Sequence, residues 1–387
     1  MKIQKELAFT VDEYMGRHRR VCLEVANRGL DALIVHTPEN ICFLSGFQTP
    51  GYYYSQFLVV QPGRDPIIVL RALEGRGVDA HCWFSSENYK GYGDGESPMV
   101  VLADLVKSLG LGAGTLGVEM YGWFLSIGRF RELEALLPNV RMVDASGVVE
   151  EGRKIKSPAE IAYIRRACRI AELGMESAVR YCRAGISENE VAGEVHKTMV
   201  AAGCEYTGLP AFLASGHRAL VSHAIWSDKI IEEGDSIYAE FAGTVKRYAG
   251  PLFRTLVLGK PSSSVLRNSK TALRMLDAAM NAIKPGVESQ EVSQAVTAAS
   301  SQGGAKVFKR PGYSVGINFA PDWGEGNFLE LKDGDRTVIR PGMVFHLPQS
   351  VRVPNEAPVA ISETVLVTET GIDVLTNFRR ELLVVGT

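Results

Sequence analysis

The chain has 387 residues, of which 46% are hydrophobic and 22% charged, with a formal net charge of −2. Its length accommodates two domains of ordinary size, and its near-neutral charge lacks the basic excess of proteins that bind nucleic acid. No apolar stretch is long enough to span a bilayer, and residues 1–6 lack an apolar signal core. We therefore expect a cytoplasmic protein with no nucleic-acid or membrane partner. Six scattered cysteines without a C-x-x-C pair favour buried, reduced thiols.

The first 150 residues alternate between helix and strand patterns. Thr10 to Glu13 is typical of a capping box that begins a helix, and Gly29 is typical of a helix end. Further strands are predicted at residues 30–35, 67–70 and 116–119, and further helices around residues 98–109 and 128–137. This alternation predicts an α/β domain over residues 1–150.

A second domain is predicted over residues 157–387. A polar stretch at residues 150–156 indicates a linker, and Ser157 with Glu160 forms the pattern of a capping box that begins a long helix. An internal repeat follows, in which residues 185–191 are echoed by 286–292, 234–240 by 342–348, and 254–258 by 363–367. Each half has the pattern helix, helix, strands. Two such halves predict a pseudo-twofold α+β domain with helices outside a curved sheet, and a binding cleft on the inner face.

Two carboxylates stand on strand patterns of this domain. Glu240 lies within the apolar run from Ile237 to Gly243, and Glu363 lies in the second half of the repeat. Burying a charge is costly unless it is paired, so these residues need a reason to be there. One alternative is a structural ion pair, for example between Glu363 and Arg254. Their occurrence in both halves favours the other alternative, a pair of carboxylates in the cleft.

The segment from Glu240 to Thr255 resembles the central hairpin of the creatinase/aminopeptidase family, whose catalytic domain has the pita-bread fold. Metallopeptidases of that family carry Asp, Asp, His, Glu and Glu at five positions that hold two metal ions. The resemblance maps these positions onto Glu240, Pro251, Tyr313, Pro348 and Glu363. Proline offers no donor atom, so the resemblance implies that the metal site is lost and that no cofactor is used.

The chain resembles the ectoine hydrolases of this family more than creatinase, in residues 240–255, 310–316 and 321–325. Both are metal-independent members that cleave C–N bonds in cyclic amidines or guanidino compounds. The resemblance implies hydrolysis of a small cationic or zwitterionic nitrogen compound. Glu240 would activate water or attack the substrate carbon, while Glu363 and Trp323 hold the cationic group. His223 would pass a proton to the leaving nitrogen, with a structural histidine as the alternative.

Further roles follow from the same resemblance. Tyr313 would donate a hydrogen bond to the substrate or to Glu240. Trp323 would stack on the cation, with a core tryptophan as the alternative. Arg254, near the substrate site, would fix Glu363 through a bidentate pair. His346 alternates to the other sheet face and is expected to be structural.

Residues 45–56 lie where family members place an aromatic lid loop, often over the neighbouring subunit's cleft. Phe47, Tyr52, Tyr53 and Tyr54 are therefore candidate substrate contacts, and Pro50-Gly51 favours an exposed turn before the tyrosines. Ordinary packing of a Tyr-rich strand is the alternative. The resemblance also implies a homodimer. Two other functions stay open: a metal-dependent Xaa-Pro dipeptidase with an unusual ligand set, and a non-catalytic protein that binds a small molecule on the same fold.

Overall fold

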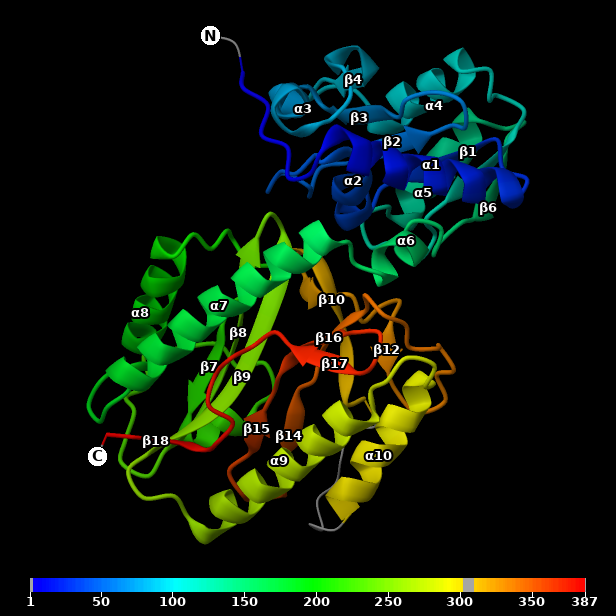
Figure 1. Cartoon of the computed structure of the whole chain (residues 1–387). Helices are drawn as coiled ribbons and strands as arrows, with labels where there is room; N and C mark the ends of the chain where they lie inside the picture. Colours follow the sequence, from blue (N-terminus) through cyan, green and yellow to red (C-terminus); the bar gives the residue numbers. More distant parts are fainter. Residues whose placement is uncertain (1–2, 302–309, 387) are drawn as a thin grey trace. The chain divides into compact units, whose positions relative to one another are not determined.

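The computed structural model describes residues 3–301 and 310–386 (Figure 1). The chain divides into two compact units, one ending at Arg153 and the other beginning at Lys154. The predicted fold class is confirmed: an α/β unit comes first, and a larger α+β unit follows. None of the helices in the described ranges has the length and apolar character needed to cross a membrane.

Within the described residues, the first unit is built on a six-stranded sheet in the order β4-β3-β2-β1-β5-β6. Its strands are β1 Ala32–Val35, β2 Phe57–Val60, β3 Ile67–Arg71, β4 Tyr89–Tyr92, β5 Thr115–Val118 and β6 Arg141–Asp144. Its helices are α1 Val11–Asn27, α2 Pro38–Ser45, α3 Gly75–His81, α4 Pro98–Ser108, α5 Ile127–Leu136 and the short α6 Glu150–Lys154. As predicted, the side chain of Thr10 caps α1, and Gly29 follows the helix with a φ of 66°.

The described part of the second unit contains a twelve-stranded sheet flanked by four helices, two from each half of the repeat. The first half contains α7 Pro158–Tyr181, α8 Glu188–Ala201, β7 Phe212–Ser215, β8 Ser236–Val245 and β9 Tyr248–Leu258. The second half contains α9 Ser263–Ala282, α10 Ser289–Ser301, β10 Gly312–Phe319, β11 Asp322–Gly324, β12 Glu330–Leu331, β13 Val344–His346, β14 Gln349–Val351, β15 Val359–Ile361, β16 Thr364–Val367, β17 Ile372–Val374 and β18 Leu383–Val385.

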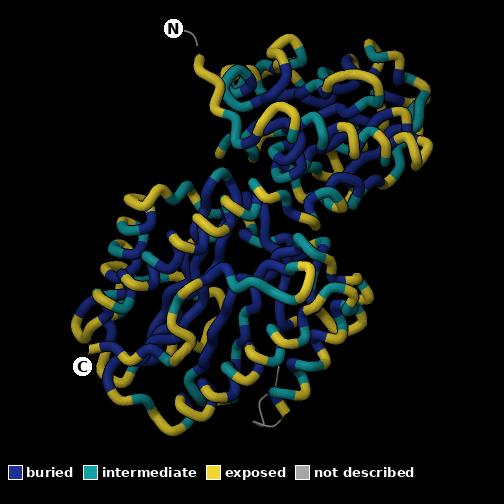
Figure 2. Tube along the Cα trace, viewed as in Figure 1, coloured by how far each residue is buried: buried dark blue, intermediate teal, exposed yellow. Residues whose placement is uncertain are grey.

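Each half has its own hydrophobic core. In the first, α7 packs against the β8–β9 hairpin and α8 packs against α7 and β7, and in the second, α9 and α10 pack against each other and the later strands. Figure 2 shows that the strands of this unit are buried almost along their whole length, whereas its helices are exposed along one side. Burial on both faces explains why β8 and β9 are continuous apolar runs.

The backbone of the β8–β9 hairpin lies in direct contact with the backbone of α7. A Cβ atom added to Gly243 would lie 2.1 Å from the carbonyl oxygen of Ala167, and one added to Gly250 would lie 2.3 Å from the nitrogen of Cys168. Both positions therefore require glycine. This close approach fixes the hairpin on the helix, and the hairpin in turn positions Glu240 near the middle of β8.

Candidate active site

A pocket of about 580 Å³ lies in the second unit, lined by residues from both halves of the repeat. Strand β8 contributes Tyr238 and Glu240, and strand β9 contributes Phe253. The second half contributes Tyr313 from β10. The other residues of the wall are Leu209, Phe212, Ser222, His223, Arg310, Pro321, Asp322, Trp323, Pro348, Ser350 and Arg352. The cleft thus combines the two halves, as the repeat predicts.

Glu240 is the buried carboxylate of this pocket. Its residue surface is 6% exposed, and Tyr238, two positions earlier on the same strand face, donates a hydrogen bond to its Oε2 over 3.2 Å. No lysine, arginine or histidine among the described residues forms an ion pair with it. Burial raises the pKa of Glu240 to about 8, against the opposing effects of the Tyr238 hydrogen bond and the charge of Arg352. The pocket therefore holds a carboxyl group whose ionisation depends on an added positive charge.

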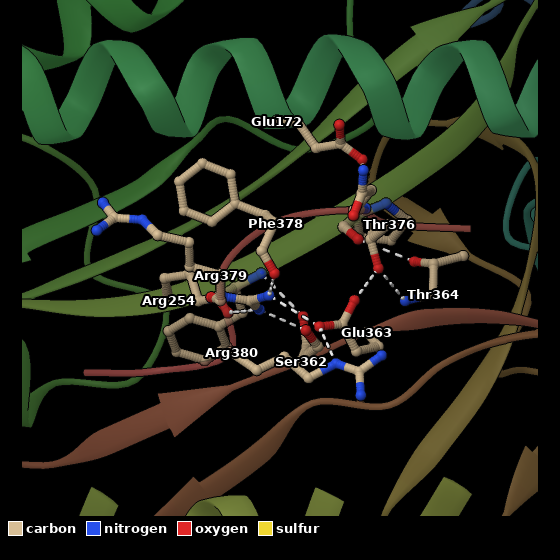
Figure 3. Close-up of polar contacts among 12 residues, drawn as sticks. Glu172, Arg254, Ser362, Glu363, Thr364, Thr376, Phe378, Arg379 and Arg380 are labelled. Carbon is tan, nitrogen blue, oxygen red and sulfur yellow. Dashed lines mark hydrogen bonds and ion pairs between the residues drawn. The ribbon is translucent and has the colours of Figure 1, made fainter. Parts of the chain in front are cut away.

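Glu363 lies elsewhere, so the predicted pair of cleft carboxylates is not formed. The side chain is fully buried, and it is not part of the pocket wall. Nη2 of Arg254 donates to its Oε1 over 2.8 Å and Nε of Arg380 donates to the same oxygen over 3.0 Å, while the hydroxyl of Thr376 donates to Oε2 (Figure 3). Two guanidinium groups thus neutralise this carboxylate. The structural ion pair, given above as the alternative, is the arrangement observed.

Arg254 is buried with Glu363 and does not line the pocket, contrary to its prediction as a substrate contact. Only one of its nitrogens bonds to Glu363, so the predicted bidentate pair is also absent. Its other N–H groups donate to backbone carbonyls of Phe253, Ser362, Phe378 and Arg379, which joins β9 to the segment before β18 (Figure 3). Burial lowers the pKa of Arg254, and Glu363 opposes this effect.

Tyr313 and Trp323 face the pocket together. Nε1 of Trp323 donates a hydrogen bond to the Tyr313 hydroxyl over 2.9 Å, and the Trp323 ring packs on Phe212 with centroids 5.1 Å apart. Burial raises the pKa of Tyr313, and the nearby charge of Glu240 adds to that effect. Nδ1 of His346 lies 2.9 Å from the same hydroxyl oxygen. His346, expected to be structural, does not line the pocket itself and contacts the pocket wall through Tyr313.

His223 reaches the pocket from the loop between β7 and β8. Its backbone is in the left-handed region, with a φ of 60°, and its ring packs on Phe212 with centroids 4.9 Å apart. A left-handed backbone at a residue other than glycine costs energy and persists where the surroundings hold it. His223, which the family resemblance predicts to lie in the cleft, is part of the pocket wall.

Glu188, at the start of α8, holds the His223 loop at both ends. This fully buried carboxylate accepts hydrogen bonds from the backbone nitrogen and hydroxyl of Ser215, over 2.7 and 2.9 Å, and from the corresponding atoms of Ser227, over 3.0 and 2.9 Å. Arg218 forms an ion pair with it. Sequence reasoning missed this role, because an acidic residue after an N-cap serine is ordinary at a helix start.

Arg352 and Ser350 were also missed. Counting along β14 and just beyond it, Pro348, Ser350 and Arg352 alternate onto the pocket side. The Ser350 hydroxyl is buried without a hydrogen-bond partner among the described residues. Arg352 donates to the carbonyl of Leu220 over 3.1 Å, and no carboxylate in the described ranges pairs with its guanidinium. This strand therefore presents a donor and a positive charge beside one vacated metal-ligand position.

The aromatic candidates of the first unit differ from one another. Phe47, a candidate substrate contact, is 1% exposed and packs against α3, where a Cβ on Gly77 would lie 2.9 Å from its ring, so it does not belong to an exposed surface of this unit. The turn after it exposes Tyr53 and Tyr54, whose residue surfaces are 75% and 39% accessible. Tyr52 packs edge-on against Phe124 with ring centroids 5.7 Å apart. The exposed turn is present, and Tyr53 and Tyr54 form its accessible aromatic surface.

The residues at the mapped metal positions do not fit a pair of metal ions. Pro251 and Pro348 carry no donor, and both oxygens of Glu363 are engaged by Arg254, Arg380 and Thr376. Over residues 3–301 and 310–386, no three His, Cys, Asp or Glu side chains come together as a metal-binding group. Hard and borderline cations need several oxygen or nitrogen donors each, which this arrangement does not supply.

Comparison with known proteins agrees with the two-unit fold. Residues 162–369 match the model of metallopeptidase family M24, and residues 17–155 match the creatinase/prolidase N-terminal domain. The chain is 31% identical to ectoine hydrolase of Halomonas elongata, over 99% of this chain and 100% of that one. It is 27% identical to Xaa-Pro dipeptidase of Pyrococcus furiosus, over 92% and 95%. Prolidase from Thermococcus sibiricus superposes with a TM-score of 0.86 at 20% identity, covering 97% of this chain and 100% of that one, which shows the fold alone.

Proposed function

Because the chain belongs to metallopeptidase family M24, we propose that it is a hydrolase that acts, without a metal ion, on a C–N bond of a small cationic or zwitterionic nitrogen compound. A cyclic amidine or a guanidino acid fits this description. The observation that carries the proposal is Glu240, a buried carboxyl group in an aromatic pocket with no cation paired to it among the described residues. The ectoine hydrolase relative supports the same reaction class.

A cationic substrate would supply the positively charged partner that Glu240 lacks among the described residues. An amidinium or guanidinium beside the carboxylate favours the ionised form of Glu240, and its N–H groups donate hydrogen bonds to the two carboxylate oxygens. Trp323, Phe212 and Tyr238 line the same pocket, and a desolvated cation over an aromatic face gains about 2 kcal/mol. Substrate binding and activation of Glu240 would therefore be one event.

A carboxylate on the substrate would bind to a positively charged group of the pocket. Arg352 and the unpartnered hydroxyl of Ser350 offer a guanidinium and a donor to such a group. The combination of Glu240 on one strand and Arg352 beyond another supports a zwitterion over a simple cation. Glu363 and Arg254 have no part in this assignment, since both are used by the network of Figure 3.

In the proposed reaction, ionised Glu240 takes a proton from a water molecule as its oxygen adds to the amidine carbon. His223 gives a proton to the departing nitrogen, so the products are an amide and an amine. The left-handed backbone at His223 and the hold of Glu188 on its loop support a positioned acid. The pocket wall supplies apolar surface that keeps bulk water away from the reacting carbon.

A second candidate is an Xaa-Pro dipeptidase, because two relatives and one solved structure of the same fold carry that name. The experiment that separates the candidates is a product analysis of the purified, chelator-treated protein by NMR. Its panel holds ectoine, hydroxyectoine, creatine, other guanidino acids and Xaa-Pro dipeptides. Ring opening or cleavage of an amidine or guanidine supports the proposal. Dipeptide cleavage alone would replace it, and tight binding without turnover would favour a non-catalytic binding protein.

A further inference from the structure

Three buried side chains meet at the hydroxyl oxygen of Tyr313. Nε1 of Trp323 and Nδ1 of His346 each lie 2.9 Å from it. Tyr313 and His346 are cross-strand partners on β10 and β13, and their rings meet edge to face with centroids 5.3 Å apart. His346 is fully buried, and its Nε2 has no hydrogen-bond partner among the described residues. The reaction outlined above does not use His346.

The number of protons in this group leaves two arrangements. Tryptophan can only donate, tyrosine has one proton to give, and a neutral imidazole carries one N–H. Burial lowers the pKa of His346 to about 3, assisted by the charges of Arg254 and Arg310, so its ring is neutral at physiological pH. The imidazole proton therefore lies either on Nδ1, facing Tyr313, or on Nε2, facing no partner.

The two arrangements differ in what Tyr313 offers to the pocket. If the proton is on Nε2, Tyr313 must donate to Nδ1, and a buried N–H is left unpaired. If it is on Nδ1, Trp323 and His346 both donate to the phenol oxygen, and the hydroxyl proton is free to point elsewhere. Unpaired buried N–H groups are rarer than under-used acceptors in backbone surveys, and the same desolvation argument applies to an imidazole. The tautomer with its proton on Nδ1, which leaves only a lone pair unpaired at Nε2, therefore has the lower desolvation cost.

We infer that His346 donates from Nδ1 to Tyr313 and so, together with Trp323, directs the hydroxyl proton of Tyr313 into the pocket. There it donates to the oxygen that adds to the substrate carbon and ends as the amide oxygen of the product. His346 is a positioning residue, and Tyr313 is the group that touches the reacting atoms. The use of this donor rests on the proposed function, whereas the proton position on His346 does not.

The proton position can be measured without any substrate. In protein labelled with 15N-histidine, long-range 1H–15N correlation spectra distinguish a protonated ring nitrogen from a bare one, and the His346→Asn variant assigns the signal. The inference predicts a protonated Nδ1 and a bare Nε2 at His346 from pH 6 to pH 8. A proton on Nε2 would overturn it, even if an amidine is turned over. Conversely, Nδ1–H in a protein that hydrolyses no amidine would leave the hydrogen bond standing and remove the proposed function.

Kinetics of variants test the route through Tyr313. His346→Asn retains an N–H near the Nδ1 position, whereas His346→Leu has similar volume and no donor. We expect His346→Leu to lower kcat on the order of tenfold, as loss of an outer-shell partner does, and His346→Asn to restore most of it. In a Tyr313→Phe background, His346→Leu should change kcat less than about twofold, because the hydroxyl group through which His346 acts is already absent. An equal loss in both backgrounds would mean that His346 acts only on folding, and would refute the inference.

Discussion

The hydroxyl of Tyr238 donates to Oε2 of Glu240 over 3.2 Å, from two residues earlier on the same strand. A phenol supplies a hydrogen bond but no charge, so this contact holds the carboxyl group in place without neutralising it. The charge of Glu363, in contrast, is neutralised, because Arg254 and Arg380 both form ion pairs with it. Two carboxylates at mapped metal positions are therefore held differently: within the described residues Glu240 has no cationic partner, and Glu363 has two.

Substrate capture should depend on the protonation of Glu240. Its pKa of about 8 lies above the ordinary value because of burial, so the free enzyme carries a neutral carboxyl group below that pH. Only the ionised form pairs with a cation. We expect the association constant of a cationic substrate analogue, which needs no proton from His223, to rise about tenfold per pH unit below pH 8 and to level off above it. A profile from pH 5 to 9.5 measures this, and a flat profile across pH 8 would contradict it.

Glu363→Gln should damage stability more than chemistry. The substitution leaves the buried guanidinium of Arg254 without its carboxylate, and breaking a buried pair in this way costs about 3–5 kcal/mol. Urea unfolding measures the loss. The matched control is Glu24→Gln, which removes an exposed helix pair with Arg28 and should cost less than about 0.5 kcal/mol. If Glu363→Gln were as stable as Glu24→Gln but inactive, Glu363 would belong to the chemistry after all.

Arg352→Met should weaken the binding of substrates that carry a carboxylate. The guanidinium has no carboxylate partner in the described part of the chain, so its removal leaves no buried acid unpaired and the fold should persist. Loss of a charge-assisted pair costs about 1.5–3 kcal/mol, which corresponds to a KM raised roughly 10- to 150-fold. A neutral amide of the same substrate should lose much less affinity, and only through the higher pKa that Glu240 takes once the charge of Arg352 is removed. Arg267→Met, at a surface pair with Glu356, is the control and should leave KM unchanged.

Glu188→Gln should loosen the loop that carries His223. The amide cannot accept all the bonds that the carboxylate takes from Ser215, Ser227 and Arg218. We expect kcat to fall on the order of tenfold while KM changes little, since the residue does not line the pocket. Faster amide exchange in residues 216–227 would report the loosening directly. Glu190→Gln, from the exposed capping box of the same helix, should do neither.

Much of the fold could be predicted because its signals are local. The capping box at Ser157 forms as the sequence indicates, and the repeat of helix, helix and strands follows from matched segments about a hundred residues apart. Glu240 could be placed in the cleft from its strand pattern and the repeat, whereas the position of His223 followed from the family resemblance.

The errors concern contacts between distant parts of the chain. The partners of Glu363 include Arg380 and Thr376, which no local pattern connects with a strand carboxylate. Phe47 belongs to a segment with exposed neighbours, yet tertiary packing buries it. Strand alternation was applied to His346 without knowledge of its partner strand, and the pairing with Tyr313 decides its contact. The sequence could show which residues occupy the site positions, whereas the structure was needed to show which residues contact one another.

The most direct test of the account is the turnover of an amidine or guanidino acid by protein stripped with a chelator, its metal content measured by mass spectrometry, beside the Glu240→Gln variant treated in the same way. We predict that the stripped wild-type protein keeps its full rate, that added Mn²⁺ does not increase it, and that Glu240→Gln is folded and inactive. A rate that vanishes on stripping and returns with Mn²⁺, or a Glu240→Gln protein that still turns over, would contradict it.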